Sequence, residues 1–163
     1  MMDKSIENLK EAVAKKNDKA HVHNNLGLSY FEIGDYPNAI NSYSNAIKHD
    51  NAKSAVHFNN RGLANYHNNE LDNAKIDFDE AIKRDPNDPT IVFNRGNVFL
   101  NWDKKDRFEK AHRDYDKAIE LAPTNAKFWH AKGLAYESEA EELLAEKKEA
   151  GSELNNLAIQ MYQ

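Results

Sequence analysis

The chain has 163 residues, of which 30% are charged and 40% are hydrophobic, and its formal net charge is −5. It contains no Cys, which excludes a disulfide framework, a thiol nucleophile and a thiolate metal site. No apolar run approaches the ~20 residues that span a bilayer, and the first residues lack the apolar segment of a signal peptide, so we expect a soluble cytoplasmic protein that does not contact membranes.

The charge is distributed unevenly along the chain. Between Glu137 and Glu153 there are seven Glu against two Lys, which accounts for the whole net charge, and residues 1–136 are balanced. Nucleic-acid binding requires a basic patch that displaces counterions. The sequence shows no such patch, so nucleic acid is not an expected partner.

The first predicted element is an amphipathic helix over about residues 3–16. Ile6, Leu9 and Val13 form one apolar stripe at helical spacing. We expect this helix to pack against the following helix, which contains Leu26 and Tyr30, either as an N-terminal cap of the fold or as the remnant of a lost repeat.

A unit of about 34 residues then recurs along the chain. Gly27, Gly62, Gly96 and Gly133 are 35, 34 and 37 residues apart. Each of the first three is followed by an Ala, an aromatic residue four positions later and a second Ala three positions after that. These sets are Ala39, Tyr43 and Ala46; Ala74, Phe78 and Ala81; and Ala111, Tyr115 and Ala118. Such a period is typical of stacked helical units, in which the small residues lie where two helices approach most closely.

The repeat predicts three antiparallel helix pairs and the first helix of a fourth unit. Gly34 and Asn69 occupy equivalent turn positions, and both tolerate the left-handed conformation that ends a helix. The turn of the third pair contains three extra residues, so we expect it to protrude. The predicted pairs are 20–33 with 36–49, 54–67 with 71–84, and 88–101 with 106–121, and the fourth unit begins near 125.

The fourth unit departs from the pattern. No Gly or Pro follows Gly133 until Gly151, and residues 126–148 are predicted to form one long helix that overshoots its neighbours by about two turns. Ala158 and Tyr162 have the Ala-to-aromatic spacing of a second helix, displaced by thirteen residues. We therefore expect an elongated or truncated fourth hairpin that bends near Gly151, with an overhang that is solvated or contacts a basic partner.

The recurring Gly, Ala and aromatic positions resemble the tetratricopeptide repeat family over nearly the whole chain. The resemblance implies an all-α fold, a right-handed superhelical solenoid of antiparallel helix hairpins, as a single domain over residues 1–163. It also implies a protein–protein interaction module that binds an extended peptide or a partner helix in a concave groove. Two alternatives stay open: a passive structural segment of a larger scaffold, or the regulatory arm of an enzyme whose catalytic domain lies outside this chain. The implied repeats cover about 20–53, 54–88, 89–125 and 126–163.

Family geometry implies which side chains face the groove. Asn25, Asn60 and Asn94 recur at one position in adjacent repeats. Because a side-chain amide both donates and accepts hydrogen bonds, a ladder of them suits an extended peptide backbone, as in the asparagine ladder of O-GlcNAc transferase and kinesin-light-chain repeats. The alternative is that Asn merely suits a polar helix surface in a chain with 21 Asn. The implied groove residues are Asn24, Asn25, Leu28, Phe31, Asn59, Asn60, Leu63, Tyr66, His67, Phe93, Asn94, Asn97, Asn101 and His130.

Co-chaperone members of the family hold the terminal carboxylate of heat-shock chaperones with two Lys, two Asn and one Arg. Without these cations a carboxylate has nothing to pair with, and this chain has at most one of them, so a chaperone tail is not an expected partner. The equivalent positions hold Asn24, Leu28, Asn60, Thr90 and Asn94 in the first three repeats, and Asn59, Leu63, Asn94, Lys127 and Ala131 in the last three.

No arrangement of side chains indicates catalysis, a cofactor or a metal. Glu109 and His112 match half of a carboxylate-bridged di-iron motif, but that site needs a second such pair. None of the seven His has the spacing of a catalytic triad. Arg61, Arg95 and Lys132 precede the repeat glycines, and we expect their stems to pack between repeats with the charges at the rim.

Overall fold

The computed structural model describes residues 2–14 and 19–161 of the chain. These residues form eight α-helices and contain no strand. The predicted helix pairs agree with the observed helices to within one residue at every end. The helices are α1 (Met2–Ala14), α2 (Ala20–Glu32), α3 (Tyr36–His49), α4 (Ala55–His67), α5 (Leu71–Arg84), α6 (Pro89–Leu100), α7 (Arg107–Leu121) and α8 (Ala126–Met161).

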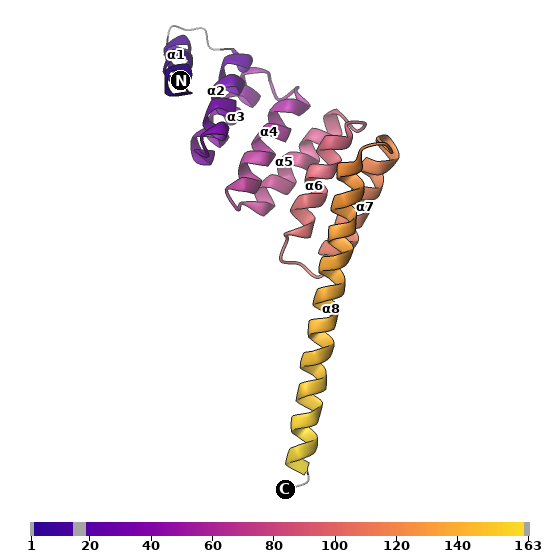
Figure 1. The fold of residues 1–163 in the computed structure, drawn as a ribbon. Coiled ribbons are helices and arrows are strands. Elements are labelled where there is room, and N and C mark those ends of the chain that lie inside the picture. Colours follow the sequence, from indigo (N-terminus) through magenta and orange to yellow (C-terminus); the bar gives the residue numbers. More distant parts are fainter. Residues whose placement is uncertain (1, 15–18, 162–163) are drawn as a thin grey trace.

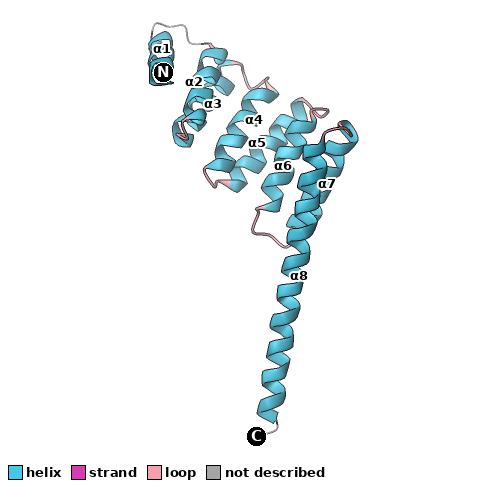
Figure 2. Ribbon diagram, viewed as in Figure 1, coloured by secondary structure: helices cyan, strands magenta, loops and turns pink. Residues whose placement is uncertain are grey.

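The helices are arranged as a row of antiparallel hairpins. α2 and α3, α4 and α5, and α6 and α7 form three hairpins that lie side by side, with α1 at one end of the row (Figure 1). α8 packs against α7 at the other end and then continues far beyond the row as a single helix (Figure 2). Each helix contacts chiefly the helices before and after it in the chain, as in a solenoid.

The turns within the first two hairpins use residues suited to ending a helix. Gly34 has φ 77° and Asn69 has φ 61°, both in the left-handed region. The next backbone N–H in each turn, from Asp35 and Glu70, donates to the carbonyls of Tyr30 and Asn65. These bonds satisfy carbonyls that a helix end otherwise leaves unpaired. The prediction for these two turn positions is confirmed.

The helices of each hairpin pack closely because the recurring glycines lack a side chain. A Cβ built on Gly27 would lie 2.6 Å from the Tyr43 ring, and one on Gly96 would lie 2.8 Å from the Tyr115 ring. Both rings are almost completely buried. Gly62 meets Phe78 in the same way at 3.0 Å. The repeated Gly and aromatic positions therefore form the contact that closes each hairpin.

The N-terminal helix extends this core at one end of the row. Ile6 of α1 is buried in a cluster with Leu26 and Tyr30 of α2, and Leu9 packs against the same cluster. The predicted end of this helix, near residue 16, lies outside the described residues.

The fourth unit is a single helix in the described residues. α8 runs without interruption from Ala126 to Met161, which confirms one long helix over 126–148. The predicted bend near Gly151 is wrong, because the helix continues through this residue. A Gly inside a helix costs only about 1 kcal/mol relative to Ala, and its neighbours favour the helix. Leu143 and Leu144 of the overhang are 51% and 59% exposed.

Candidate functional site

The first helices of the three hairpins present one continuous face. α2, α4 and α6 contact one another along the row, and residues at i, i+3 or i+4, and i+7 share one side of a helix. We call this surface the first-helix face. It carries Asn24, Leu28 and Phe31 on α2; Asn59, Asn60, Leu63, Tyr66 and His67 on α4; and Asn94, Asn97 and Asn101 on α6.

Four asparagines form a chain of hydrogen bonds across this face, which we call the amide row. Asn94 Nδ2 donates to Asn59 Oδ1 at 3.1 Å, and Asn60 Nδ2 donates to Asn24 Oδ1 at 3.0 Å. Asn59 Nδ2 lies 3.4 Å from Asn60 Oδ1 and links the two pairs. The amide row therefore joins α6 to α4 and α4 to α2.

Asn25 does not belong to the amide row, although it occupies the same repeat position as Asn60 and Asn94. Its side chain is exposed and lines an open hollow between α1 and α2, together with Asn8 and Ser29. The reason is that each first helix has two flanks. On α2, the position of Asn25 faces α1, which precedes it in the row. The position of Asn24 faces α4 of the next repeat.

The same two-flank geometry places Phe93 in the core instead of on an open groove. Phe93 is only 3% exposed, and its ring centroid lies 4.9 Å from that of Phe128 on α8. His130 holds the equivalent position on α8 and is exposed. The structure thus separates these two residues from the first-helix face of α2, α4 and α6.

Four packed rings, which we call the aromatic cluster, lie where α2 and α4 end and α3 begins: Phe31, Tyr36, Tyr66 and His67. His67 lies at its centre, with ring centroids 5.3 Å from Phe31, 5.5 Å from Tyr36 and 5.4 Å from Tyr66. His67 is exposed and the other three are half-buried. The sequence interpretation missed Tyr36, which begins α3 directly after the turn; its place beside that turn was the available signal.

Polar groups around the aromatic cluster are hydrogen-bonded. Asn101 Nδ2 donates to Tyr66 Oη at 2.9 Å, and Tyr115 Oη donates to Asn97 Oδ1 at 2.8 Å. Burial raises the pKa of the Tyr66 hydroxyl, although the hydrogen bond from Asn101 opposes this shift. The hydroxyl group is therefore neutral at physiological pH. Leu28, between the amide row and the aromatic cluster, is 40% exposed.

Arginines that precede the repeat glycines bind buried carboxylates. Arg95 donates from Nε and Nη2 to Asp114 of α7, both at 2.7 Å, and from Nη1 to Asp79 of α5 at 2.7 Å. Arg61 binds Asp77 in the same way. The stems of the two arginines pack between repeats. The expectation that their charges lie at the rim is wrong, because each guanidinium binds a carboxylate, Asp77 or Asp114, that is nearly inaccessible.

The pairs with Asp77 and Asp114 each join the two helices of one hairpin, and the pair of Arg95 with Asp79 joins neighbouring hairpins. Burial raises the pKa of the Asp114 carboxyl, and the hydrogen bonds from Arg95 oppose that shift. Removing one partner of such a pair leaves an uncompensated buried charge. The equivalent lysine on α8, Lys132, donates to Asp116 of α7 at 2.5 Å. We interpret this flank as structural and not as a ligand site.

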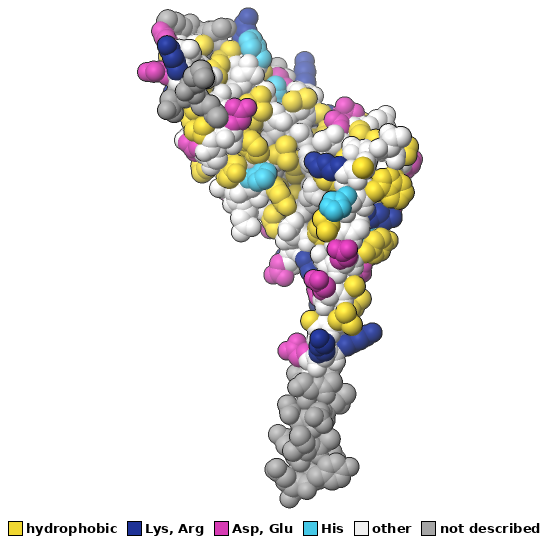
Figure 3. Space-filling view, in the orientation of Figure 1, with side chains coloured by type: hydrophobic (Ala, Val, Ile, Leu, Met, Phe, Trp, Pro, Cys, Tyr) yellow, Lys and Arg dark blue, Asp and Glu magenta, His cyan; other side chains and the backbone are white. Residues whose placement is uncertain are grey.

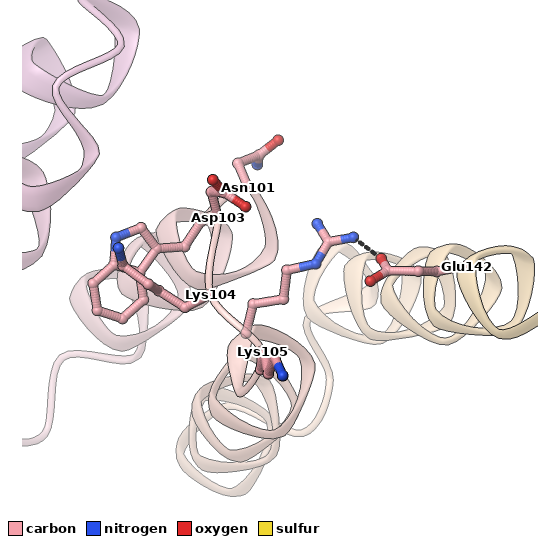
Figure 4. Close-up of a pocket in the computed structure, with 7 residues that line it drawn as sticks. Asn101, Asp103, Lys104, Lys105 and Glu142 are labelled. Carbon is pink, nitrogen blue, oxygen red and sulfur yellow. Dashed lines mark hydrogen bonds and ion pairs between the residues drawn. The ribbon is translucent and has the colours of Figure 1, made fainter. Parts of the chain in front are cut away.

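The loop between α6 and α7, predicted to protrude, folds back on the hairpin before it. Trp102 is half-buried, and its Nε1 donates to Asp72 Oδ1 on α5 at 2.9 Å. The loop borders a hollow that α8 closes on one side, where Arg107 and Glu142 form an ion pair (Figure 4). Arg107, the first residue of α7, therefore ties this corner of the hairpin to α8.

The part of the chain that the structure describes contains no cluster of three or more side chains suited to a metal ion. Glu109 pairs with Arg113, and His112 Nε2 lies 3.0 Å from Glu139 Oε2, which accounts for both members of the half-motif. None of the described helices is long and apolar enough to cross a membrane.

Comparison with known proteins identifies the family. Models of the tetratricopeptide repeat match residues 24–89 and residues 114–158, which together make up more than half of the chain. The chain belongs to the tetratricopeptide repeat family. A search of curated proteins found no match.

Solved tetratricopeptide repeat structures share the fold. The chain is 24% identical to MamA, with a TM-score of 0.77, and the match covers 85% of this chain and 79% of MamA. It is 24% identical to the first repeat domain of Spaghetti (RPAP3) bound to the HSP90 peptide SRMEEVD, with a TM-score of 0.68, covering 74% and 93%. It is 22% identical to the TPR2B domain of yeast Sti1 in a complex with pHsp70, with a TM-score of 0.67, covering 73% and 97%. At these identities the likeness establishes the all-helical solenoid.

Proposed function

We propose that this chain is a protein-interaction module that binds an extended peptide across the first-helix face. The observation that carries the proposal is the presence of the amide row and the aromatic cluster on the same face of α2 and α4. Partly exposed aromatic rings are enriched at the centres of protein interfaces. The solved structures of Spaghetti (RPAP3) and Sti1, which share the fold, are complexes with an HSP90 peptide and with pHsp70, and this supports a role in binding a protein partner.

The amide row can contribute hydrogen bonds without releasing its internal ones. Each side-chain amide has two N–H donors and an oxygen with two acceptor sites, and the bonds between helices use only part of this capacity. An extended backbone offers alternating donors and acceptors that match the remaining groups. Asn94 is only 8% exposed, so we assign the peptide contacts chiefly to the α2 and α4 members, Asn24, Asn59 and Asn60.

The expected peptide is not an acidic chaperone tail. Lys127 is the only cation at a position equivalent to the carboxylate clamp, and its Nζ lies 4.8 Å from the centroid of the Phe93 ring. A terminal carboxylate would therefore find no cluster of free cations there. The partner that fits best carries apolar or aromatic side chains on an extended, near-neutral segment.

The test starts with a random peptide display library, from which a peptide that binds the purified chain is selected. The dissociation constant of this peptide is then measured by fluorescence anisotropy. His67→Ala and Phe31→Ala should each weaken binding by at least about tenfold. Ile76→Ala is the matched control, because Ile76 is 57% exposed on α5, away from the first-helix face. Equal affinities for all three variants would contradict the proposal, as would tight binding of SRMEEVD.

A further inference from the structure

A small hollow lies between α3 and α5, the second helices of the first two hairpins. Its volume is about 280 Å³, slightly below the ~300–1,000 Å³ of small-molecule sites, and this size suits a single side chain. Two isoleucines form apolar walls: Ile40 of α3 is half-buried, and Ile76 of α5 is 57% exposed. The ion pair of Arg61 with Asp77 also lines the hollow, and its two charges cancel.

Glu70, which precedes α5, gives the hollow a negative charge that no cation balances. Its Oε1 accepts from Asn68 Nδ2 at 2.6 Å, and its Oε2 accepts from Asn73 Nδ2 at 2.7 Å. Both donors are neutral amides, so they hold the carboxylate in place without compensating its charge. Among the described residues, Glu70 forms no ion pair.

Two amide oxygens accompany this carboxylate in the lining of the hollow. Asn65 is only 4% exposed, and its Nδ2 donates to Asp77 Oδ2 at 2.8 Å, but its amide oxygen accepts no hydrogen bond from the described residues. The backbone N–H of Glu70 donates to the carbonyl of Asn65 at 2.8 Å, which keeps the two residues together. Asn73 also uses only its Nδ2. A lysine ammonium, with three donors and no acceptor, complements such a group of acceptors.

The equivalent carboxylate of the next hairpin is paired with a lysine. Asp106 precedes α7 as Glu70 precedes α5, and Lys110 Nζ lies 2.6 Å from its Oδ2. Lys110 holds the repeat position of Asn73, directly before the first recurring Ala of the helix. The chain thus supplies a lysine to one of these carboxylates and only amides to the other, so a lysine is the group that the hollow lacks.

We propose that the hollow receives a lysine side chain from a protein partner. Its methylene stem lies between Ile40 and Ile76, as lysine stems commonly cover apolar surface, and its ammonium binds Glu70. An arginine fits less well, because its planar fork favours two available carboxylate oxygens and both oxygens of Glu70 already accept from amides.

This contact is separate from the first-helix face. The isoleucine walls and Glu70 belong to the second helices and to the turn before α5. In the view of Figure 3 the middle of the row carries hydrophobic and uncharged side chains, and charged ones gather toward its two ends. That surface offers a lysine little to pair with, in contrast to the hollow.

The first experiment titrates the isotopically labelled full chain with Nα-acetyl-lysine amide and follows the side-chain amide signals of Asn65 and Asn73 by NMR. Saturable shifts with a dissociation constant of roughly 1–10 mM are expected. Nα-acetyl-norleucine amide, which has an apolar stem without the charge, should cause none. Equal shifts with these two probes, or tighter binding of Nα-acetyl-arginine amide, would overturn the proposal.

The second experiment occupies the hollow from within the chain. Asn73→Lys gives Glu70 the intramolecular partner that Asp106 has in α7, and it should weaken binding of the lysine probe at least about fivefold. Asn38→Lys is the matched control, because Asn38 holds the same repeat position in α3 but does not line the hollow. Equal affinities of the two variants for the probe would count against the proposed site.

The third experiment removes the charge. Glu70→Gln should weaken binding of the probe at least about fivefold, whereas Glu120→Gln, in an exposed ion pair on α7, should leave it unchanged. An equal effect of both substitutions would show unspecific attraction to acidic side chains and refute a defined site. His67→Ala, on the first-helix face, should bind the probe as the parent does, so these results are independent of peptide binding by that face.

Discussion

The same substitution at two repeat glycines should change stability in opposite directions. Gly27→Ala introduces a methyl group 2.6 Å from the ring of Tyr43, which is 1% exposed and cannot move aside freely. Gly133→Ala introduces the same group at a position with no atom within 4 Å. Both residues lie inside helices, so the gain in helix propensity is common to both variants.

The magnitudes follow from two opposing effects. Overpacking a well-filled core costs about 1–3 kcal/mol, and replacing Gly by Ala inside a helix contributes about 1 kcal/mol. The contact at Gly27 is well below ordinary van der Waals distance, so Gly27→Ala should lower the free energy of unfolding by about 1–2 kcal/mol. Gly133→Ala should raise it by up to about 1 kcal/mol, since only the propensity remains.

Urea unfolding followed by circular dichroism at 222 nm would measure both effects, at a protein concentration at which the chain is monomeric. A change in the midpoint at constant slope reports a change in stability. Gly62→Ala is an internal standard of intermediate effect, because its Cβ would lie 3.0 Å from Phe78. A Gly27→Ala variant as stable as the parent, or equal destabilisation by Gly133→Ala, would refute the packing argument.

Three further predictions concern single side chains. Arg95→Met leaves the buried carboxylate of Asp114 without its partner and should lower the free energy of unfolding by about 3–5 kcal/mol. Arg113→Met removes an exposed ion pair and should lower it by less than about 1 kcal/mol in the same urea titration. Asn94→Ala should cost about 0.5–1.5 kcal/mol through its lost hydrogen bond, and Asn25→Ala, outside the amide row, should leave the midpoint unchanged. Burial lowers the pKa of His57, although the nearby carboxylate of Asp50 opposes the shift. The neutral imidazole therefore contributes its full share of the folding free energy above about pH 6.5, and this share is lost as the pH falls through the lowered pKa of the folded state. His57→Gln should therefore lose less stability than the parent between pH 7 and pH 5; an identical loss would contradict this reasoning.

The sequence alone determined the helices and the contacts that close each hairpin. Gly27 and Tyr43 are 16 positions apart across a short turn, as are Gly62 and Phe78, and the third pair differs only by the three extra residues of its turn, so local spacing is enough to pair them. Gly34 and Asn69 identified the turns because few residues tolerate positive φ. The long helix after Ala126 followed from composition, since nothing in it favours a break before Gly151.

Only the tertiary structure decided which side chains meet between repeats. The recurrence of Asn25, Asn60 and Asn94 predicted one row, but hydrogen bonding pairs Asn60 with Asn24 because each first helix presents different flanks to its two neighbours. The stacking of Tyr36 on His67 was likewise decided by the packing of adjacent repeats. Tyr36 belongs to a second helix, and the repeat pattern places only first-helix residues on the first-helix face. A repeat pattern shows which positions are equivalent from one unit to the next. The side chains that touch between units depend on how adjacent helices are shifted relative to each other, and residue spacing does not encode this shift.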